Sequence, residues 1–526
     1  MTTSAPMTDL MGGQPLTIRP IFDRMRTIYA DGEVVDATGR TTYGELSERV
    51  LRIVTVLREL GVKPGDRVAT FANNSARHLE LYYAIPLAGA VLHMVNIRLY
   101  AEQIEYVVQH AGDVVLVADD DLLPAVENLT EQCPDLRLVM TMSELAGKAA
   151  VAAPTTDLPE LQEEWPSGIC YTSGTTGMPK GVVYSHRSMY VHAMAACMAD
   201  HLGLSEHDRV LPVVPLFHAC GWGLPYAAPF TGAELIFAGA DTSPANLARI
   251  IREERITFAG GVPTIWTQLL PLAKSGEADV SSLRALMVGG AATPRPLMEE
   301  WDALGVPILQ LWGMTETAPL ACASRPRRRH KDLDEEARRE VRLKTGTIFA
   351  GLEARIVGDD GVELPWDGES VGELECRGPW VATAYYDDDA LSSEKFRDGW
   401  LRTGDMAFME PDGYFKIVDR SKDLVKSGGE WISSLDLEAA VMAHPRVCEA
   451  AVVGVRSVRW DERPVVVVVP EGEPPTVAEL HEFLTGRVAK WWFPDDIVVV
   501  DEIPKTSVGK YDKKVMRTML ADRVLP

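Results

Sequence analysis

The spacing of apolar residues alternates between two patterns along the first two thirds of the chain. In residues 42–60, TYGELSERVLRIVTVLREL, apolar side chains recur every three or four positions, which predicts an amphipathic helix. Short runs rich in apolar and β-branched residues stand between such stretches, at 66–72, 113–119, 136–141, 233–239 and 283–290. Helices that alternate with buried strands are typical of an α/β fold, whose sheets are largely parallel and covered on both faces.

The pattern changes in the last third of the chain. The segments 354–361, 371–378 and 405–420 are short strand-like runs, and the turns that follow or interrupt them contain Asp-Gly. Such turns are typical of antiparallel pairing. We therefore expect a small β subdomain at 345–419.

Length and pattern together predict two domains. A chain of 526 residues is too long for one ordinary hydrophobic core. The charged, turn-prone stretch 419–431 separates a large N-terminal domain of α/β subdomains, residues 1–419, from a last unit of helix and strand patterns. We expect the boundary at 420–423 and a small α+β C-terminal domain at 424–526.

Composition narrows the possible partners. A formal net charge of −24 would repel a phosphate backbone, so nucleic-acid binding is not expected. The seven cysteines are scattered without paired metal-ligand spacing, which fits a reducing compartment. No run reaches the roughly 18 apolar residues of a membrane helix, and the N-terminus lacks a secretory pattern. We expect a cytoplasmic protein with no integral membrane segment, for which peripheral lipid contact stays open.

The segment 171–186, YTSGTTGMPKGVVYSH, combines three features that suit phosphate binding. Its glycines let backbone amides approach an anion, its hydroxyls can donate hydrogen bonds, and Lys180 adds charge. It breaks the P-loop pattern, because Pro179 precedes the lysine and Gly181 follows it. A P-loop kinase or ATPase is therefore disfavoured. The alternative, a Gly- and Thr-rich surface turn, seldom combines all three features.

A second segment, 309–320, LQLWGMTETAPL, follows a strand-like run. Gln310 and Trp312 could pack against a planar base, and Gly313 allows close backbone approach. Thr315 and Glu316 place a hydroxyl beside a carboxylate, which suits phosphate and a hard cation such as Mg²⁺. Taken alone, the segment is equally well explained as the end of an aromatic core strand with a capping threonine.

Two further segments each contain one candidate residue. Asp405 lies in a Thr-Gly-Asp sequence that we expect to form a turn, where its carboxylate could accept two ribose hydroxyls or simply close an Asx-turn. Lys510 follows Gly509 on an expected loop near the C-terminus. Without further context, a lone lysine there would be read as solvated surface.

In their order and spacing these segments resemble the acyl-adenylate-forming superfamily of acyl-CoA synthetases, adenylation domains and luciferases. The resemblance runs through YTSGTTGMPKG, WGMTETAP, RTGDMA with DGYFKIVDRSKDLVKSGGEWIS, and PKTSVGK, and so covers nearly the whole chain. It implies ATP, Mg²⁺ and CoA as cofactors and cosubstrates, with Thr172 and Glu316 holding the metal. It also implies that Lys510 bridges the carboxylate and the α-phosphate during adenylation.

The same resemblance implies the nucleotide contacts. The phosphate loop would comprise Thr172, Ser173, Gly174, Thr175, Thr176, Gly177 and Lys180. Gly290, Gln310, Leu311 and Trp312 would line the adenine slot, Asp405 and Arg420 would bind the ribose, and Thr315 would also contact the nucleotide. Lys422 would be the hinge about which a mobile C-terminal domain rotates. Gly428 and Gly429 would line the CoA channel, and Lys426 and Trp431 would lie beside it and near the nucleotide.

The acyl pocket is predicted from two apolar, Gly-rich segments, 214–230 and 258–270. Neither carries an obvious aspartate to pair a substrate ammonium, so an amino-acid substrate is disfavoured. The segments look most like the medium- to long-chain fatty acyl-CoA synthetase branch, which implies a gating role for Trp222 and a place near the acyl carboxylate for His218. Gly261 and Val262 would line the pocket. The alternatives are a core tryptophan and a histidine packed against a helix.

The sequence therefore predicts an ATP-dependent ligase that joins a medium- to long-chain aliphatic acid to CoA through an acyl-adenylate. A ligase that loads a carrier protein, a CoA ligase for a short or substituted acid, and a noncatalytic binding module remain alternatives. The resemblance also favours a homodimer. Trp312, Ser421 and Asp461 stand where the superfamily more often has Tyr, Leu and Gly. The basic cluster 325–331 and the helix-like 332–344 are expected to be solvated surface, with lipid or CoA phosphate contact as the alternative.

Overall fold

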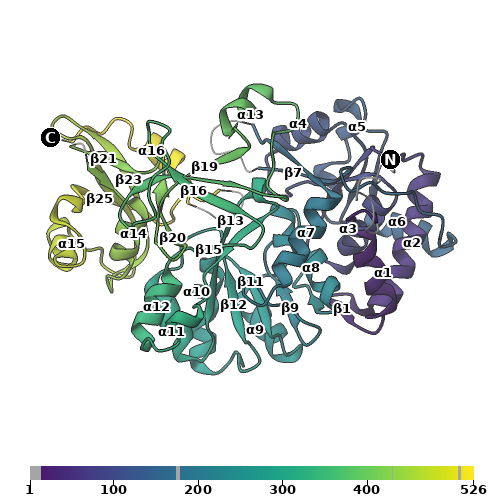
Figure 1. Ribbon diagram of the computed structural model, residues 1–526, viewed down its shortest axis with the longest axis horizontal. Helices are drawn as coiled ribbons and strands as arrows, with labels where there is room; N and C mark the ends of the chain where they lie inside the picture. Colours follow the sequence, from purple (N-terminus) through teal and green to yellow (C-terminus); the bar gives the residue numbers. More distant parts are fainter. Residues whose placement is uncertain (1–12, 173–177, 429, 507–510, 526) are drawn as a thin grey trace, which may run out of the picture.

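A computed structural model describes residues 13–172, 178–428, 430–506 and 511–525. Among these residues three sheets are present, with six, fourteen and five strands. The chain runs from the purple helices on the right of Figure 1, through the teal and green sheet in the centre, to the yellow C-terminal unit on the left. The α/β fold class predicted from the sequence is confirmed.

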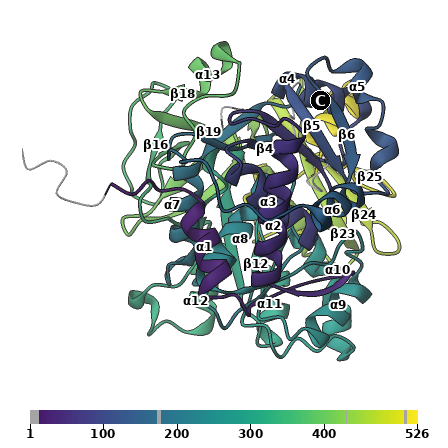
Figure 2. The ribbon, with the colours of Figure 1, turned by 90° about the vertical axis from the view of Figure 1, so that its right-hand side faces the viewer.

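The six-stranded sheet lies in the N-terminal part of the chain. Its strands, in spatial order, are β6 (Leu138–Thr141), β5 (Asp113–Ala118), β3 (Arg67–Phe71), β4 (Val91–Met94), β7 (Pro166–Tyr171) and β8 (Gly181–Ser185). All neighbours are parallel except β7 and β8. One face packs against α2 (Tyr43–Glu59), α3 (Ala76–Leu87) and α6 (Met142–Val151), which Figure 2 brings to the front. The other packs against α4 (Ala101–Ala111) and α5 (Leu129–Gln132).

The predicted helix at 42–60 is confirmed as α2. Thr42 and Glu45 form a capping box at its start, in which each side chain accepts a hydrogen bond from the other's backbone amide. Both faces of the six-stranded sheet are buried, and successive side chains along β3 point to opposite faces. Val68 belongs to the core beneath α2 and α3, whereas Ala69 faces α4 and α5.

The central sheet begins as a parallel sheet. In spatial order from the outer edge it contains β2 (Gly39–Thr42), β1 (Glu33–Asp36), β10 (Glu234–Ile236), β9 (Arg209–Pro212), β11 (Phe258–Gly261), β12 (Ala285–Val288) and β13 (Ile308–Gly313). All neighbours here are parallel except β1 and β2. The associated helices are α1 (Arg19–Thr27), α7 (His186–Cys197), α8 (Leu224–Thr231), α9 (Pro244–Glu253), α10 (Pro263–Ser275) and α11 (Arg295–Ala303).

Beyond β13 the same sheet continues with antiparallel strands. They are β14 (Leu320–Ala323), β15 (Gly346–Ile348), β20 (Tyr414–Arg420), β19 (Trp400–Met409), β17 (Val371–Arg377) and β16 (Glu353–Val357), with β18 (Phe396–Arg397) beside β19. The antiparallel pairing expected after residue 350 is present, and it is hydrogen-bonded into the parallel sheet through β13. The segment 309–320 therefore lies where the sheet changes from parallel to antiparallel.

One local expectation was wrong. Thr403, Gly404 and Asp405 do not form a turn, because they lie inside the ten-residue strand β19. Neighbours on both sides, β17 and β20, supply backbone hydrogen bonds, and the three residues together face Leu374 as a bulge. Gly404 adopts a φ of +75°, which a glycine tolerates at no steric cost.

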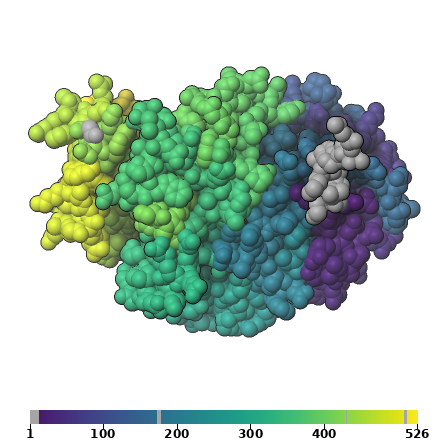
Figure 3. All heavy atoms as spheres, in the orientation of Figure 1, coloured from purple at the N-terminus to yellow at the C-terminus, as the bar shows by residue number. Residues whose placement is uncertain are grey.

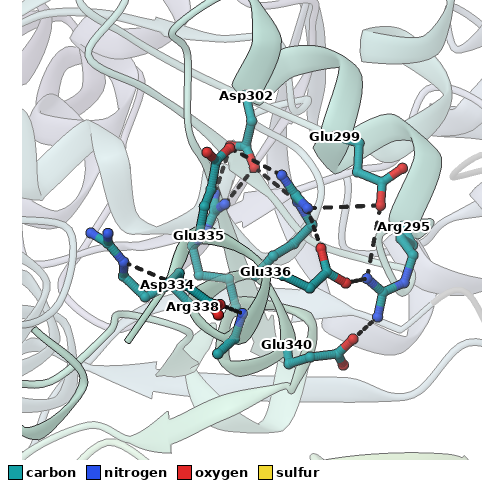
Figure 4. Close-up of polar contacts among 11 residues, drawn as sticks. Arg295, Glu299, Asp302, Asp334, Glu335, Glu336, Arg338 and Glu340 are labelled. Carbon is teal, nitrogen blue, oxygen red and sulfur yellow. Dashed lines mark hydrogen bonds and ion pairs between the residues drawn. The ribbon is translucent and has the colours of Figure 1, made fainter. Parts of the chain in front are cut away.

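Helix α12 (Glu335–Leu343) is a surface helix, as expected, and ion pairs hold it against α11. Figure 4 shows the cluster, in which Arg342 donates to Asp302 at 2.8 Å and Arg295 to Glu336 at 2.7 Å. Arg339 also binds Asp302, and its side chain is only 12% exposed. Because several charges share partners, this network holds α12 more firmly than isolated surface pairs would.

The C-terminal unit contains the five-stranded sheet. Its strands are β22 (Glu430–Ile432), β21 (Val425–Ser427), β24 (Asp461–Pro470), β23 (Val447–Ser457) and β25 (Asp496–Val499), with helices α14 (Ser434–Met442), α15 (Val477–Leu484) and α16 (Lys513–Met519). It lies at one end of the molecule (Figure 3). It contacts the central sheet through β20, where Lys416 pairs with Asp436 at 2.7 Å and Ser434 donates its amide to Asp419 at 2.6 Å.

A buried ion pair lies inside this unit. Lys513 Nζ lies 2.7 Å from Glu438 Oε1, and the two side chains are 10% and 6% exposed. We expect Lys513→Met to destabilise the protein by about 3–5 kcal/mol, because it leaves an uncompensated carboxylate in the interior. Denaturant unfolding measures this. The double variant Lys513→Met/Glu438→Leu should recover most of the loss, and a double variant as unstable as the single one would contradict the explanation.

Candidate active site

The predicted phosphate loop connects two antiparallel strands. It follows β7 at the carboxyl edge of the six-stranded sheet and returns as β8. Thr172 and Lys180 close it: the Thr172 amide donates to the Lys180 carbonyl at 2.9 Å, and the Lys180 amide donates to Thr172 Oγ1 at 3.2 Å. A P-loop leads instead into a helix, so the strand pair explains the absent P-loop pattern.

Five predicted residues of this loop lie outside the described residues: Ser173, Gly174, Thr175, Thr176 and Gly177. The same holds for Gly429 of the predicted CoA channel and for the predicted catalytic Lys510. Their roles therefore stay predictions.

The second segment lies beside this loop. Glu316 is in a short 3₁₀ turn, Thr315–Thr317, and is only 5% exposed. The Thr315 carbonyl accepts a hydrogen bond from Tyr184 of β8 at 2.8 Å. This bond ties the strand after the phosphate loop to the turn that holds the predicted metal ligand.

Tyr385 is a site residue that the sequence analysis missed. Its hydroxyl donates to Glu316 Oε1 at 2.6 Å, and the Lys180 ammonium lies 5.6 Å from its ring centroid. Burial, followed by the negative charge of Glu316, raises the pKa of Tyr385, so the hydroxyl remains a donor at neutral pH. No sequence pattern pointed to it, because its partners are 69 and 205 positions away in the chain.

The predicted adenine and ribose residues come together on three strands. Asp405 is 3% exposed and receives a hydrogen bond from the Trp312 indole at 2.9 Å. Its other carboxylate oxygen pairs with Arg420 at 2.6 Å. Leu311 precedes Trp312 in β13 and is also buried. The arrangement holds a carboxylate and a guanidinium beside the edge of an aromatic ring.

Gln310 holds neighbouring segments together. Its side-chain carbonyl accepts from the Thr293 amide at 3.0 Å, and its amide donates to the Lys344 carbonyl at 3.1 Å. It thereby connects the loop after β12 to the end of α12. Gly290 in that loop has a φ of +84°, a conformation that favours glycine. The hydrogen bond from Thr293 to Gln310 thus helps to fix the loop that contains Gly290.

Trp222 lies in a left-handed turn. Five consecutive residues, Ala219–Gly223, have φ values between +37° and +74°, and residues with a side chain rarely adopt this region. The Trp222 ring is 6% exposed and packs over Gly260 and Gly289, where an added Cβ would lie 3.7 Å and 3.2 Å from it. The indole therefore separates the apolar segments from the Gly289–Gly290 loop.

His218 immediately precedes this turn, and its backbone amide donates to the Pro215 carbonyl at 3.0 Å. The other predicted pocket residues lie at the end of β11. The Gly261 carbonyl accepts a hydrogen bond from the Trp266 indole at 3.3 Å, and Val262 is the N-cap of α10. The predicted acyl-pocket residues thus follow two strands that are neighbours in the sheet, β9 and β11.

Replacing Trp222 with alanine should broaden chain-length preference, because it removes the largest apolar side chain between the pocket segments and the Gly289–Gly290 loop. We expect kcat/KM for the preferred acid to fall about tenfold or more, and that for longer acids to rise relative to it. A competition assay with a mixed-length acid pool measures this. An unchanged length profile in a folded variant would contradict the gating role.

Lys426 and Trp431, predicted to lie beside the CoA channel, are on β21 and β22, and the predicted channel residue Gly428 directly follows β21. Lys426 pairs with Trp431 across the strands, and its ammonium is 5.6 Å from the indole ring. Gly428 has a φ of +61° and lies so close to Trp460 that a Cβ would meet its ring at 2.8 Å. Asp461 has a φ of +73°, which explains why this position suits a glycine.

The predicted hinge is contacted by helix α16. Arg517 donates to the Lys422 carbonyl at 3.0 Å and pairs with Asp423 at 2.5 Å. Burial lowers the pKa of Lys422. Helix α16, which contacts the predicted hinge, begins three residues after Lys510 in the sequence.

The donor atoms present fit Mg²⁺ better than a transition metal. Within the described ranges no group of three or more His, Cys, Asp or Glu side chains could hold a metal. Mg²⁺ is usually held by one or two carboxylates together with substrate phosphates and water. Glu316, a single buried carboxylate near the predicted phosphate loop, is consistent with this type of Mg²⁺ coordination.

Comparison with known proteins agrees with this geometry. Residues 23–386 match the model of the AMP-binding enzyme family, and residues 436–510 match that of the AMP-binding enzyme C-terminal domain. The chain belongs to the AMP-binding enzyme family. The family model thus covers the predicted phosphate loop, the Glu316 turn and Tyr385, and the C-terminal match runs from within α14 to Lys510.

Relatives within the AMP-binding enzyme family match over almost their full length. A long-chain-fatty-acid–CoA ligase of Thermus thermophilus is 43% identical, with 96% of each chain covered. A 3-methylmercaptopropionyl-CoA ligase of Ruegeria lacuscaerulensis is 41% identical (98% and 99% covered), and a medium-chain-fatty-acid–CoA ligase of Ectopseudomonas oleovorans is 39% identical (95% and 93%). The structure of the anthranilate CoA ligase AuaEII with anthranoyl-AMP superposes with a TM-score of 0.88 at 26% identity, covering 96% and 97%.

Across the described residues, the protein has no helix that is both long and apolar enough to cross a membrane.

Proposed function

We propose that this protein activates a medium- to long-chain fatty acid and transfers the acyl group to CoA. In the first step a carboxylate oxygen attacks the α-phosphorus of ATP, the bond to the β-phosphate breaks, and pyrophosphate leaves. In the second step the CoA sulfur attacks the acyl carbon, the acyl–phosphate bond breaks, and AMP leaves as the thiol proton is released. The chain is thus an acyl-CoA synthetase that uses ATP and CoA.

The observation that carries the substrate class is the position of Trp222. It is buried among apolar segments on one side and packs over Gly289 of the loop next to Gly290 on the other. A pocket lined by these apolar segments would end beside the Gly289–Gly290 loop, and such a pocket would suit a hydrocarbon tail whose carboxylate must reach the α-phosphate. The names of the relatives from Thermus thermophilus and Ectopseudomonas oleovorans support the same class.

Catalysis in this proposal rests on position and charge. Lys180 and Lys510 would neutralise the phosphates and the attacking carboxylate, and Asp405 with Arg420 would hold the ribose. Thr172 and Glu316 would hold Mg²⁺, which when bound offsets charge on the departing pyrophosphate. Lys422 would serve as the hinge that removes Lys510 after adenylation and brings Gly428 and Gly429 beside the incoming thiol.

A second candidate is a CoA ligase for a short, substituted acid such as a thioether acid. The 41% identity to a 3-methylmercaptopropionyl-CoA ligase over 98% of the chain favours it. Both candidates share the adenylation chemistry. They would differ in the length of the acyl pocket, which the Trp222 side chain would limit.

Mass spectrometry of products separates these candidates. Purified enzyme is incubated with ATP, Mg²⁺ and a panel of short to long fatty acids, thioether acids and aryl acids, each with and without CoA. Thioesters that peak at one medium or long aliphatic length would support the proposal. A peak at a thioether acid would favour the second candidate, and acyl-AMP that accumulates despite CoA would indicate a carrier-protein acceptor.

Three further predictions belong to the same proposal. We expect a homodimer in the cytoplasm, because homodimers are common in the branch that the chain resembles.

Peripheral contact with anionic lipid would use the basic cluster 325–331, where Arg328 and Arg329 are exposed in a strongly acidic protein. Analytical ultracentrifugation tests the homodimer, cell fractionation the cytoplasmic location, and liposome flotation the lipid contact.

A further inference from the structure

Residues 381–386 bridge the two segments to which the proposed function assigns ATP and Mg²⁺. The Ala382 amide donates to the Glu316 carbonyl at 2.8 Å. Four residues later, the Tyr386 amide donates to the carbonyl of Gly181, at the end of the phosphate loop, also at 2.8 Å. The segment is therefore bonded through its backbone to both sides of the proposed site.

Between these two backbone bonds lies Tyr385, whose side chain repeats the same connection. Its hydroxyl donates to Glu316 Oε1, and its ring carries the Lys180 ammonium on its face. Among the described residues, Tyr385 is the hydrogen-bond donor to the Glu316 carboxylate, and it donates to Oε1. A hydroxyl on one carboxylate oxygen fixes the rotation of the carboxylate and leaves the second oxygen for another ligand.

The ring itself is held firmly. Phe396 packs edge-on against Tyr385, with ring centroids 5.3 Å apart, and the Tyr385 amide donates to Ser392 Oγ at 2.9 Å. Tyr385 is only 7% exposed. A side chain fixed from behind in this way can impose an orientation on Glu316 and Lys180.

We propose that Tyr385 is a positioning residue that orients the Glu316 carboxylate toward Mg²⁺ and places Lys180 for the same phosphates. This inference rests on the proposed function, and in particular on Glu316 as the metal ligand. In this proposal a single tyrosine links the phosphate loop to the metal ligand.

The test measures nucleotide binding at equilibrium instead of turnover. Titration calorimetry with a non-hydrolysable ATP analogue, with and without Mg²⁺, gives the factor by which the metal tightens binding. Tyr385→Phe keeps the ring and removes the hydroxyl, so we expect this factor to fall about tenfold, the worth of one hydrogen bond to a charged group, while metal-free binding stays unchanged. Tyr385→Leu should also weaken metal-free binding, because Lys180 loses the ring.

A matched control is Tyr190→Phe in α7, where the ring packs on Phe230 away from these contacts. It should leave both titrations unchanged. The double variant Tyr385→Phe/Glu316→Gln completes a cycle: if the hydroxyl acts through Glu316, it should lose little beyond Glu316→Gln alone.

Three results would overturn the inference: a wild-type factor near one, a Tyr385→Phe factor equal to wild type, or fully additive losses in the double variant. Thermal melts confirm that each variant is folded. The titrations contain no acid substrate. If the product assay disproved the fatty-acid assignment, the titrations would therefore still test the role of Tyr385.

Discussion

Lys510→Ala is expected to slow acyl-adenylate formation severely while leaving thioester formation from preformed acyl-AMP largely intact. The lysine would bring together a carboxylate and the α-phosphate, two anions that repel each other without it. Removing one such group from a preorganised site typically costs about 10²–10³-fold in rate. Once the adenylate exists that repulsion is gone, so the second half-reaction has no use for this charge.

The two half-reactions are measured separately, by pyrophosphate release with ATP and acid, and by thioester formation from synthetic acyl-AMP and CoA. Lys514→Ala, an exposed lysine on the first turn of α16, is the matched control and should leave both rates unchanged. Equal losses in the two half-reactions would refute the role of Lys510 and point to a structural defect.

Glu316→Gln should produce the second largest effect, a loss of about 10²–10³-fold in adenylation at ordinary Mg²⁺ concentration. The amide keeps the shape of the side chain and can still accept from Tyr385, so the change removes charge alone. Raising the Mg²⁺ concentration should restore part of the activity, because the defect lies in metal affinity.

The control is Glu375→Gln, which removes another buried carboxylate, paired with Arg355 in the antiparallel part of the sheet at 2.7 Å. It tests whether losing any buried negative charge lowers activity. If Glu316→Gln were as active as this control at every Mg²⁺ concentration, Glu316 would have no part in metal binding.

Contacts around the predicted hinge show how the C-terminal unit is attached. Arg517 contacts the carbonyl of Lys422 and the carboxylate of Asp423. Beside it, Ser434 donates to Asp419 and Lys416 pairs with Asp436, each across the boundary between β20 and α14. A rotation about Lys422 would have to break these two contacts across the boundary. The orientation of the small domain is therefore set by a few specific polar groups, each accessible to substitution.

Local patterns were enough to predict the class of fold and most candidate site segments. Apolar spacing predicted the helix at 42–60 and the strands β3, β5, β6, β10 and β12. A helix that is buried on one face leaves a periodic apolar pattern in the sequence, and a fully buried strand leaves a short continuous apolar run. The candidate phosphate loop was visible because glycine, hydroxyl and lysine residues lie close together in the chain, and its role stays a prediction. The antiparallel pairing after residue 350 was visible in its Asp-Gly turns.

What local patterns could not determine depends on partners far apart in the chain. Asp405 lies in a strand because it pairs with Arg420 of β20, while β17 pairs with the residues that flank the bulge, although its Thr-Gly-Asp sequence alone suits a turn. Gln310 looked like a residue for stacking on a base, yet Thr293 and Lys344 occupy its side-chain amide.

The sequence by itself thus determined the chemistry that the chain offers: the phosphate loop, the carboxylates and the lysines, together with the α/β frame that presents them. Only the tertiary structure decided which of these groups meet. Tyr385 joins Glu316 and Lys180, and Asp405 joins Trp312 and Arg420, through contacts between strands and loops that are distant in sequence. The reason is physical, because periodicity records what is buried, whereas a hydrogen bond between distant residues forms only once the sheet has assembled.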